Sequence, residues 1–549
     1  MISFVDDRIF LMRRLLPLPV LPSLAVTFSL LLIWIALIML GNPVSLDDGL
    51  RHFAMARLMM EQGIGAADWS QFFSYGYFAH HSVDPWFLSN LAFIPLLPFG
   101  PVLALKIFVI ASIALLIASF LYTFHSFQTP RFVAAICIGL LLFFEPTFFY
   151  RSLLGRPFSF ITPLAVVIIV ATLRKQSILI CIALALSVLL SQVFIFPLLI
   201  AFACVFWRLS LRQWWEASAL FSWSLFGIFL GFFFHPHSSQ YFFYILDTFV
   251  RIPFIAGMQL GPEMQSGLFA SSRVFVMLTV ILLLHGGLIR KKIAWHTYQE
   301  TGLSALSFLT FFFLFLFFLW ARAIDFLWPI AILFLVRLLS LYPGLFTETL
   351  RSITPKRFIF RPTISVLIVL LLCSSSFFAV AKELVKTDGD RTLSIYEDAL
   401  RAVPSGSNVL NVDWHFFMGA VVVRSDLQYA TGIDPSYTYL DSPEALLLLA
   451  SLNTPKFQQS PTDHDVRAWL QNIVRIHPSD YLVLFRKGHE AVIDRMERGL
   501  FMKDLSMSRS IAVFELDGSG VPRVESASRF PPSHSRGRFY PRIYAYSRS

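Results

Sequence analysis

Residues 20–40 read VLPSLAVTFSLLLIWIALIML, a run without a single charged side chain. A helix of about 20 apolar residues crosses the hydrocarbon core of a bilayer, so this run is long enough to span a membrane. It is too long for the core of a signal peptide, and no small-residue cleavage site follows it. Arg8, Arg13 and Arg14 precede the run, which indicates a cytoplasmic N-terminus. The run therefore predicts a first membrane-spanning helix.

The composition of the whole chain is typical of a membrane protein. Apolar residues make up 56% of the 549 residues and charged residues 14%, against roughly a quarter charged in an average soluble domain. One soluble core could not bury that much apolar surface, which excludes soluble enzymes, disordered chains and disulfide scaffolds. The formal net charge of +10 fits contacts with anionic lipid headgroups. No basic run is interleaved with aromatic residues, so we expect membrane lipids but no nucleic acid as partners.

Further apolar runs within residues 1–381 predict a polytopic α-helical membrane domain with about eleven transmembrane helices. They lie at 20–40, 101–124, 131–148, 158–173, 177–190, 193–207, 217–234, 272–289, 302–320, 326–340 and 362–381. Lysine and arginine gather in every second charged loop, as at Arg174-Lys175, and the positive-inside rule assigns these loops to the cytoplasm. An odd number of spans then places the C-terminal region outside. Charges are nearly absent from the middle of the runs, which argues against an ion-coupled transporter.

Two regions are predicted to lie outside the membrane. The first external loop, 41–100, is too long for a simple connection. Its segments 47–61 and 85–98 are expected to lie along the membrane surface as amphipathic helices. Residues 382–517 have the composition of a soluble domain, and residues 518–549 that of a mobile tail rich in Ser, Arg and Pro. Strands at 408–412, 481–485 and 511–516, with helices at 463–476 and 489–500, predict a small external α/β domain.

The most informative polar cluster is SLDDGLRH at 45–52, directly after the first spanning run. Ser45 and Asp48 match a capping box, which would explain Asp48 well and Asp47 only in part. Two adjacent carboxylates at a membrane surface repel each other unless a cation or an acid–base role uses them. The pair therefore predicts a catalytic role. His52 comes one helical turn after Asp48, and three roles stay open for it: orienting that carboxylate, joining a metal site, or packing as an interfacial histidine.

A spanning helix followed by an acidic pair and a long external loop resembles the GT-C superfamily of membrane glycosyltransferases. Asp84-Pro85-Trp86 followed by Pro98-Phe99-Gly100 is similar to the superfamily's His-Pro-Pro-Leu and Phe-Gly segment, with Asp84 in place of the usual histidine. The resemblance covers the membrane region, roughly two thirds of the chain. It implies a GT-C-like fold, a polyprenyl-phosphate sugar as donor, and a loop acid that deprotonates or positions the acceptor.

The second external loop carries Glu145 and two arginines, Arg151 and Arg156. A lipid-linked donor presents its phosphate oxygens just above the hydrocarbon boundary, and a guanidinium group suits them because it is planar and permanently charged. The pattern predicts that both arginines bind the donor phosphate, with anchoring in lipid headgroups as the alternative. By resemblance, Glu145 stands where the superfamily often has a second acid. An internal salt bridge between Glu145 and Arg151 is equally consistent with the sequence.

The later external loops add further candidates. His235-Pro236-His237 ends a spanning run and Glu263 follows in the same loop. An extended segment could aim both histidines at one metal ion, although contact with lipid headgroups is the favoured alternative. Arg322 and Asp325 are three residues apart, which allows either a helical salt bridge or a contact between Arg322 and phosphate. The candidate ligands of a divalent metal ion are Asp48, His52, His235 and His237.

In the predicted external domain, Asn411-Val412-Asp413-Trp414-His415-Phe416 follows a strand, and Gly432-Ile433-Asp434-Pro435 follows later. These segments resemble those found after the membrane part of GT-C-like bacterial proteins. Loops at strand ends are common ligand sites, and the apolar face of Trp414 can stack on a sugar ring. Trp414 is therefore a candidate substrate-binding residue, with packing beside a turn as the alternative.

These features together predict an inverting glycosyltransferase at the periplasmic face of a bacterial inner membrane, with a cytoplasmic N-terminus and a periplasmic C-terminal domain. The donor is a polyprenyl-phosphate sugar by resemblance, and the acceptor a lipid, glycan or protein. Asp47 would be the general base and Asp48 would orient it or bind a divalent ion, while Arg151, Arg156 and Arg322 neutralise the leaving phosphate. The other candidate substrate-binding residues are His52, Asp84, Glu145, Glu263 and Trp414. Two alternatives stay open: a non-catalytic transporter or assembly scaffold, and a headgroup transferase.

Overall fold

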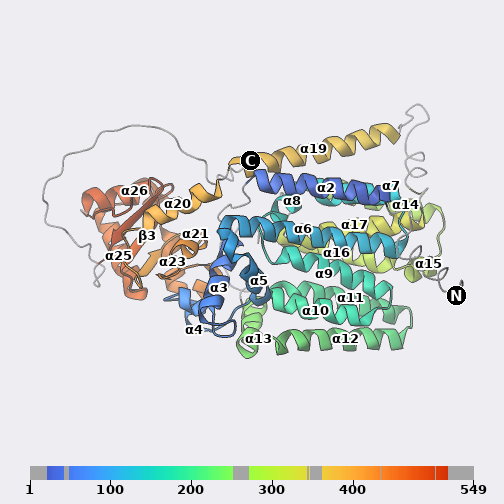
Figure 1. Ribbon diagram of the computed structural model, residues 1–549, viewed down its shortest axis with the longest axis horizontal. Coiled ribbons are helices and arrows are strands. Elements are labelled where there is room, and N and C mark those ends of the chain that lie inside the picture. Colours follow the sequence, from blue (N-terminus) through green and yellow to red (C-terminus); the bar gives the residue numbers. More distant parts are fainter. Residues whose placement is uncertain are drawn as a thin grey trace, which may run out of the picture.

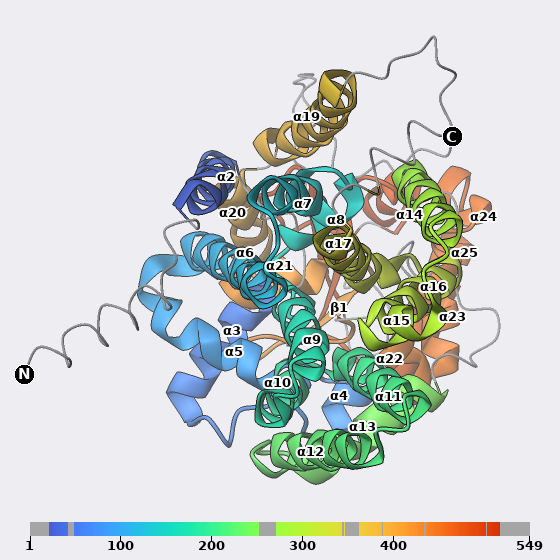
Figure 2. The same cartoon turned by 90° about the vertical axis from the view of Figure 1, so that its right-hand side faces the viewer.

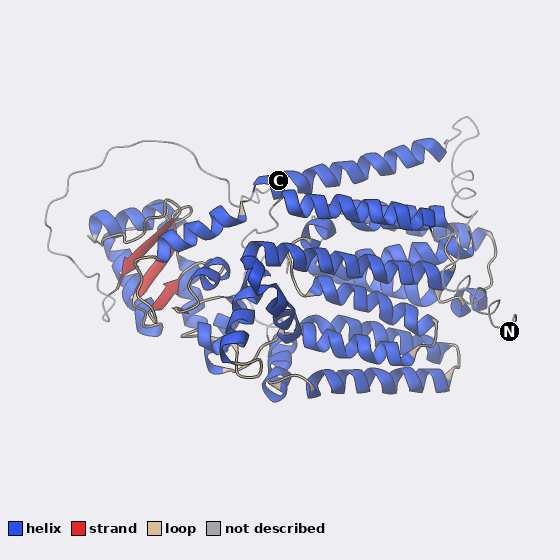
Figure 3. Ribbon diagram, viewed as in Figure 1, coloured by secondary structure: helices blue, strands red, loops and turns tan. Residues whose placement is uncertain are grey.

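The structure is a computed structural model that describes residues 21–41, 49–251, 271–342, 345, 362–386, 388–432, 435–500 and 502–516. The predicted site residues Asp47, Asp48 and Glu263, and the predicted tail 518–549, lie outside these residues. The described part has three layers along its longest axis: a helix bundle, the helices of the first external loop, and a C-terminal region that contains the sheet (Figures 1 and 3).

Every predicted apolar run falls on a helix of the bundle. These helices are α2 (Leu21–Leu40), α6 (Gly100–Phe127), α7 (Arg131–Phe143), α8 (Pro146–Ser152), α9 (Phe158–Leu173), α10 (Ser177–Leu190), α11 (Ile195–Ser210), α12 (Trp214–Phe233), α14 (Ser272–Arg290), α16 (Leu303–Leu319), α17 (Ile324–Leu341) and α19 (Pro362–Lys386). Among the described residues, five helices are long and apolar enough to cross a membrane, or six if one bent pair counts as a single span. Other helices in the set are apolar but shorter. The helical bundle is thus confirmed, whereas the number of crossings stays a prediction.

The predicted span 131–148 is broken in the structure. Helix α7 ends at Phe143, and α8 starts at Pro146 after a bend of 74°. Proline suits the first position of a helix, and it pushes the preceding residue, Glu145, out of the helical conformation. The Glu145 side chain then accepts a hydrogen bond from the backbone N–H of Thr147 at 3.0 Å. Glu145 is therefore the N-terminal cap of α8, and the predicted run 131–148 forms a bent pair of helices instead of one continuous helix.

Small residues set the closest helix contact of the bundle. An added Cβ at Gly227 of α12 would lie 2.5 Å from the carbonyl oxygen of Cys181 in α10, and one at Gly231 would meet Val188 at the same distance. Backbones that approach this closely gain dispersion contacts in a medium that offers little hydrophobic driving force. The end view in Figure 2 shows α17 inside the bundle, between α7, α8, α9 and α16. Nearly all of α17 is buried.

The first external loop forms α3 (Gly49–Gln62), η2 (Trp69–Phe72), α4 (Tyr77–His80), α5 (Phe87–Phe93) and η3 (Ile94–Phe99). The predicted helical segment 47–61 is matched by α3, but its expected place on the membrane surface is corrected. Ten of the 14 residues of α3 are buried. The helix packs against α5 and α6 on one side and a helix of the C-terminal region on the other (Figure 1). Its polar residues Arg51 and His52 are buried as well, which no membrane-surface helix would require.

The C-terminal region contains a four-stranded sheet with the order β2-β1-β3-β4. Strand β1 (Asn408–Asn411) runs parallel to β2 (Gln428–Tyr429) and β3 (Tyr481–Phe485), and β4 (Ile511–Glu515) is antiparallel to β3. The helices of the region are α20 (Gly389–Leu400), α21 (Phe416–Val423), α22 (Pro435–Asp441), α23 (Pro443–Ser451), α24 (Pro455–Gln459), α25 (Asp463–Ile476) and α26 (Glu490–Asp494). The three predicted strands coincide with β1, β3 and β4. Strand β2 was not expected, because two residues carry no alternation.

The first external loop docks directly onto the C-terminal region. Phe73 pairs with Tyr429 of β2 as an isolated parallel bridge, and the Ser74 N–H donates to the Tyr429 carbonyl at 3.2 Å. Arg57 of α3 donates to the carbonyl of Val422 at 3.1 Å and to Ser425 Oγ at 2.8 Å. The loop thus covers the β2 edge of the sheet, which would otherwise expose unpaired backbone groups. This contact holds the loop between the bundle and the sheet.

Candidate active site

The described part of the site begins in the first turn of α3, because Asp47 and Asp48 lie just before the described residues. This turn brings Arg51 and His52 to the interior, where they are 2% and 0% exposed. Charged and polar side chains are rarely buried unless they are paired. The residues that pack around this turn are therefore the expected neighbours of the predicted acidic pair.

Asp84 is the centre of a buried polar network behind this turn. Its Oδ1 accepts hydrogen bonds from Trp69 Nε1 at 2.9 Å and from the Trp86 backbone N–H at 3.2 Å. Asn90 Nδ2 lies 2.7 Å from both Asp84 oxygens. Burial raises the pKa of Asp84, and the three donors partly offset that rise. The Asp84 carboxylate therefore holds the loop together through these hydrogen bonds. A contact with substrate was predicted from the sequence, and this structural role was not.

Asn90 links Asp84 to His52, 38 residues earlier in the chain. The Asn90 side-chain oxygen forms a short hydrogen bond with His52 Nδ1. The His52 ring is packed between Trp86, edge-on at 6.2 Å, and Phe93, stacked at 6.1 Å between ring centroids. This contact with Asn90 was not among the roles left open for His52, and the role of orienting Asp48 falls outside the described residues. Asn90 was missed, although a Ser-Asn pair in an apolar segment was a usable signal.

Arg51 is a second residue that the sequence prediction overlooked. Its guanidinium carbon lies 3.9 Å from the ring centroid of Trp86 and 5.9 Å from that of Trp69. A desolvated cation over a tryptophan face is stabilised by about 2 kcal/mol. The arrangement places a permanent positive charge one residue from His52 and beside the network of Asp84.

His235, just after the end of α12, has internal partners for both ring nitrogens. His235 Nε2 contacts the carbonyl oxygen of Asp84 at 2.9 Å, and its Nδ1 accepts the backbone N–H of His237 at 3.2 Å. The ring stacks on Tyr241 at 4.2 Å, and burial lowers the pKa of His235 to about 4. Both nitrogens of His235 are thus engaged, which argues against its predicted role as a metal ligand. Within the described ranges, no group of three or more His, Cys, Asp and Glu side chains is arranged to hold a metal ion.

Arg151 forms a buried ion pair with Asp325 of α17. Its Nε and Nη2 donate to the two carboxylate oxygens, each at 2.8 Å, and the two side chains are only 6% and 4% exposed. Thr162 of α9 donates to the carbonyl of Asp325 at 3.1 Å. The alternative of a salt bridge between Glu145 and Arg151 is therefore contradicted, since Arg151 pairs with the carboxylate of Asp325. The pair connects α8 to α17 across 174 residues of sequence. No local sequence pattern could have predicted it.

Glu145 has its own partners near the break between α7 and α8. Ser271 Oγ donates to Glu145 Oε2 at 2.5 Å. The neighbouring Arg273 donates to the carbonyl of Phe144 and to the hydroxyls of Ser375 and Ser376 in α19. The carbonyl that the broken helix leaves unpaired is thus satisfied by a guanidinium group. These contacts hold the bend and tie it to α14 and α19.

The remaining arginine candidates, Arg156 and Arg322, are partly exposed, unlike Arg151. Arg156 precedes α9, and Arg322 lies in η9 (Ala321–Ala323), immediately before α17. Arg156 thus lies in the connection between α8 and α9, and Arg322 lies next to α17, the helix that carries Asp325.

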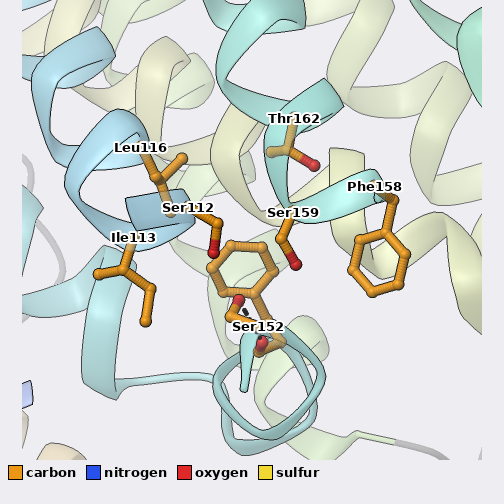
Figure 4. A pocket seen from close by; sticks show the side chains of 8 residues that line it. Ser112, Ile113, Leu116, Ser152, Phe158, Ser159 and Thr162 are labelled. Carbon is orange, nitrogen blue, oxygen red and sulfur yellow. Dashed lines mark hydrogen bonds between the residues drawn. The ribbon is translucent and has the colours of Figure 1, made fainter. Parts of the chain in front are cut away.

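A small cavity of about 10 Å³ lies between α6, α8 and α9, and hydroxyl groups line part of it (Figure 4). These hydroxyl-bearing residues are Ser112, Ser152, Ser159 and Thr162. The Ser159 hydroxyl is buried without a hydrogen-bond partner. The cavity has room for one water molecule and none for a sugar.

Trp414 lies where the parallel strands of the sheet end. It follows β1 and is half-buried, and its ring centroid is 3.5 Å from that of His415. Asp413 Oδ2 lies 3.7 Å from His489 Nδ1, in the loop after β3. Burial raises the pKa of Asp413, and the neighbouring His489 opposes that rise. The connections after β1 and β3 lead to opposite sides of the sheet, to β2 and to β4, and such a point is the usual location of ligand sites in α/β sheets.

Comparison with known proteins finds likeness in the fold alone. No protein-family model matches the sequence, and no curated protein matches it. The apo crystal structure of the Archaeoglobus fulgidus oligosaccharyltransferase covers 87% of this chain and 70% of its own, with a TM-score of 0.56 at 11% identity. The archaeal oligosaccharyltransferase AglB from Archaeoglobus fulgidus, in complex with an inhibitory peptide and a dolichol-phosphate, covers 86% and 70%, with a TM-score of 0.52 at 10% identity.

The chain therefore has an oligosaccharyltransferase-like membrane fold. The enzyme it resembles belongs to the GT-C class, so the resemblance predicted from the first external loop is confirmed at the level of the fold. The likeness extends over most of the chain, since 87% of the residues are covered.

Proposed function

We propose that this chain is a membrane glycosyltransferase that transfers a sugar from a polyprenyl-phosphate donor to an acceptor at the outer face of a bacterial inner membrane. The observation that carries the proposal is the fold shared with the archaeal oligosaccharyltransferase over 87% of the chain. One structure of such an enzyme contains a dolichol-phosphate, which supports a lipid-linked donor for this chain. The acceptor is a lipid, a glycan or a protein.

The reaction that fits these residues is a single displacement at the anomeric carbon. The acceptor hydroxyl oxygen forms a bond to that carbon while the bond from carbon to phosphate oxygen breaks, and the anomeric configuration inverts. Asp47 takes the proton of the acceptor, a role that typically accelerates a reaction by roughly 10²–10⁴-fold. The electron pair of the broken bond leaves with the lipid phosphate. Asp48 orients Asp47 or binds a divalent cation, and activity with and without EDTA separates these two roles.

Positive charge near the leaving phosphate supplies the electrostatic part of the mechanism. Arg156 and Arg322 are the arginines proposed to contact the phosphate, because both are partly exposed and each adjoins a helix that takes part in the Arg151–Asp325 contact. Arg151 is proposed to support the site without contacting the phosphate, since its pair with Asp325 fixes α8 against α17. Trp414, at the ends of the parallel strands, is proposed to contact the acceptor or its sugar.

The test supplies purified protein in lipid nanodiscs with radiolabelled polyprenyl-phosphate monosaccharides and, separately, with lipid-linked oligosaccharides. The acceptors are membrane lipids, glycans and peptides. We expect transfer by the wild type and a loss of at least 100-fold in Asp47→Asn. Glu61→Gln is the matched control, because Glu61 is an exposed acid at the end of α3 in the same loop. We expect this control to keep wild-type activity.

The outcomes separate the alternatives. Equal turnover of the wild type and Asp47→Asn would remove Asp47 as the base. No transfer from any donor would favour a non-catalytic transporter or scaffold. Transfer of a phosphate-containing headgroup instead of a sugar would favour the headgroup transferase. The anomeric configuration of the product, read by NMR, tests inversion.

A further inference from the structure

Asp84, Asn90 and His52 form a chain of hydrogen bonds inside the first external loop. All three side chains are fully buried. Asn90 Nδ2 faces both Asp84 oxygens at 2.7 Å, and Asn90 Oδ1 faces His52 Nδ1. A buried line of this kind fixes the proton positions of its members, because each group must meet its partner as a donor or as an acceptor.

The orientation of the Asn90 amide follows from Asp84. Asp84 Oδ1 already accepts from Trp69 and Trp86, so it is an acceptor. Oδ1 stays an acceptor whether Asp84 is ionised or carries a proton on Oδ2, so an amide oxygen in place of Asn90 Nδ2 would face an acceptor at 2.7 Å, which is repulsive. The NH₂ group must therefore point to Asp84, and the amide oxygen must point to His52. An oxygen of an amide can only accept, so His52 Nδ1 has to carry a proton.

We infer that Asp84 and Asn90 are positioning residues that hold His52 in the Nδ1-protonated tautomer, so that Nε2 carries the lone pair. A neutral imidazole in this tautomer offers a hydrogen-bond acceptor, and not a donor, on the side away from Asn90. Trp86 and Phe93 pack against the ring and fix its plane. Asp84 thus acts through Asn90 on His52, whereas the sequence suggested a direct contact with substrate.

The consequence for the reaction rests on the proposed function. His52 lies in the first turn of α3, which begins at Gly49, the residue after the acidic pair. A nucleophilic hydroxyl has one proton, and a neighbouring nitrogen helps to orient it only if that nitrogen accepts the hydrogen bond. The locked tautomer provides such an acceptor in the first turn of the helix, on a side chain that is 0% exposed, so the hydroxyl must enter this buried turn to reach it. In the reversed tautomer, Nε2 of His52 would carry a proton and could not accept the hydrogen bond of the hydroxyl.

Asp84→Asn is the substitution that separates this role from simple packing. Trp69 and Trp86 still need an acceptor at the position of Oδ1, so the new amide places its NH₂ group at the position of Oδ2. That group donates towards Asn90, whose amide must then turn its oxygen to residue 84 and its NH₂ group to His52. Nδ1 of His52 becomes the acceptor, and the proton moves to Nε2. The shape of the site is nearly unchanged, but the tautomer is reversed.

The direct measurement uses protein labelled with ¹⁵N-histidine in nanodiscs, with the His52 signals assigned by subtracting the spectrum of His52→Asn. We expect a protonated Nδ1 and an unprotonated Nε2 in the wild type, and the reverse in Asp84→Asn. Trp69→Phe is the matched control: it removes another donor to Asp84 but leaves the line to His52 intact, so the wild-type tautomer should persist. A wild-type ring protonated at Nε2 would overturn the inference, and this result needs no folded variant.

The activity measurement distinguishes the two proposals. Once transfer by the wild type is established, we expect Asp84→Asn to lower kcat at least 10-fold while KM for the lipid donor changes less than about twofold. His52→Gln, which keeps an amide near Nε2, should retain more activity than His52→Asn. Full activity in Asp84→Asn with a reversed tautomer would overturn the positioning role. No transfer by the wild type would instead defeat the proposed function and leave the tautomer result standing.

Discussion

Removal of one partner of the Arg151–Asp325 pair should destabilise the bundle strongly. Both hydrogen bonds are 2.8 Å long, and the side chains are 6% and 4% exposed, so water cannot replace a lost partner. Breaking a buried ion pair by removing one member costs about 3–5 kcal/mol, because the other charge stays buried without compensation. We expect Asp325→Asn to lower the free energy of unfolding by that amount.

Replacement of both partners should largely restore stability. Hydrophobic residues of similar volume in place of a buried pair are often neutral or stabilising by about 1–4 kcal/mol, because no charge has to be desolvated. The double variant is Arg151→Met with Asp325→Leu. The exposed pair Asp494–Arg498, 2.9 Å apart, is the control. Asp494→Asn should cost only about 0.3–0.5 kcal/mol.

The assay is unfolding by SDS titration in mixed micelles, followed by far-UV circular dichroism. The reasoning would be refuted if Asp325→Asn cost no more than Asp494→Asn, or if the double variant were as unstable as the single one. The same proteins test the role of Arg151 in the reaction. Restored stability with restored sugar transfer would agree with a supporting role. Restored stability without transfer would show that Arg151 contacts the donor phosphate itself.

Two further predictions concern the C-terminal region and the bundle. His477 is buried beside Tyr75 with neither ring nitrogen hydrogen-bonded, and burial lowers its pKa to about 4. The unfolded chain therefore binds more protons between pH 6.5 and pH 4, so stability falls as the pH drops through this range. At pH 4.5 the loss is about 2–3 kcal/mol relative to pH 7.5, and it should be absent in His477→Phe; equal pH dependence of the two proteins would contradict it. Gly227→Ala should destabilise the bundle by about 1–3 kcal/mol, because its Cβ would lie 2.5 Å from the Cys181 carbonyl oxygen. Gly286→Ala, with open space around it, should be neutral or slightly stabilising in the same SDS titration assay.

Local patterns in the chain were enough to locate most elements. Each apolar run falls on a helix, since the length and composition of a run depend only on neighbouring residues. The period of three to four residues after Asp47 correctly predicted α3, and the apolar segments 408–412 and 481–485 correctly predicted β1 and β3. The acidic pair and the Asp84-Pro85-Trp86 segment led to the GT-C resemblance, which the fold supports.

The burial of α3 could not be read from its sequence. Amphipathic periodicity shows that one face meets an apolar surface, but the same pattern fits a membrane and a protein interior. The C-terminal region, more than 300 residues away, decided between them: Arg57 of α3 reaches Val422 and Ser425 across a separation of 365 and 368 residues. The expected membrane-surface helix thus became the layer between the bundle and the sheet.

Partner choice among polar residues was likewise a property of the folded chain. Glu145 and Arg151 are six residues apart and of opposite charge, yet Arg151 pairs with Asp325, 174 residues away. Asp84 and His52 meet only because Asn90 lies between them. Runs of apolar residues indicate where a chain can enter a membrane, because the free energy of transferring a segment from water to lipid depends on the residues of that segment alone. Which buried charge meets which partner depends on how the helices pack, and that information lies in no single stretch of the chain.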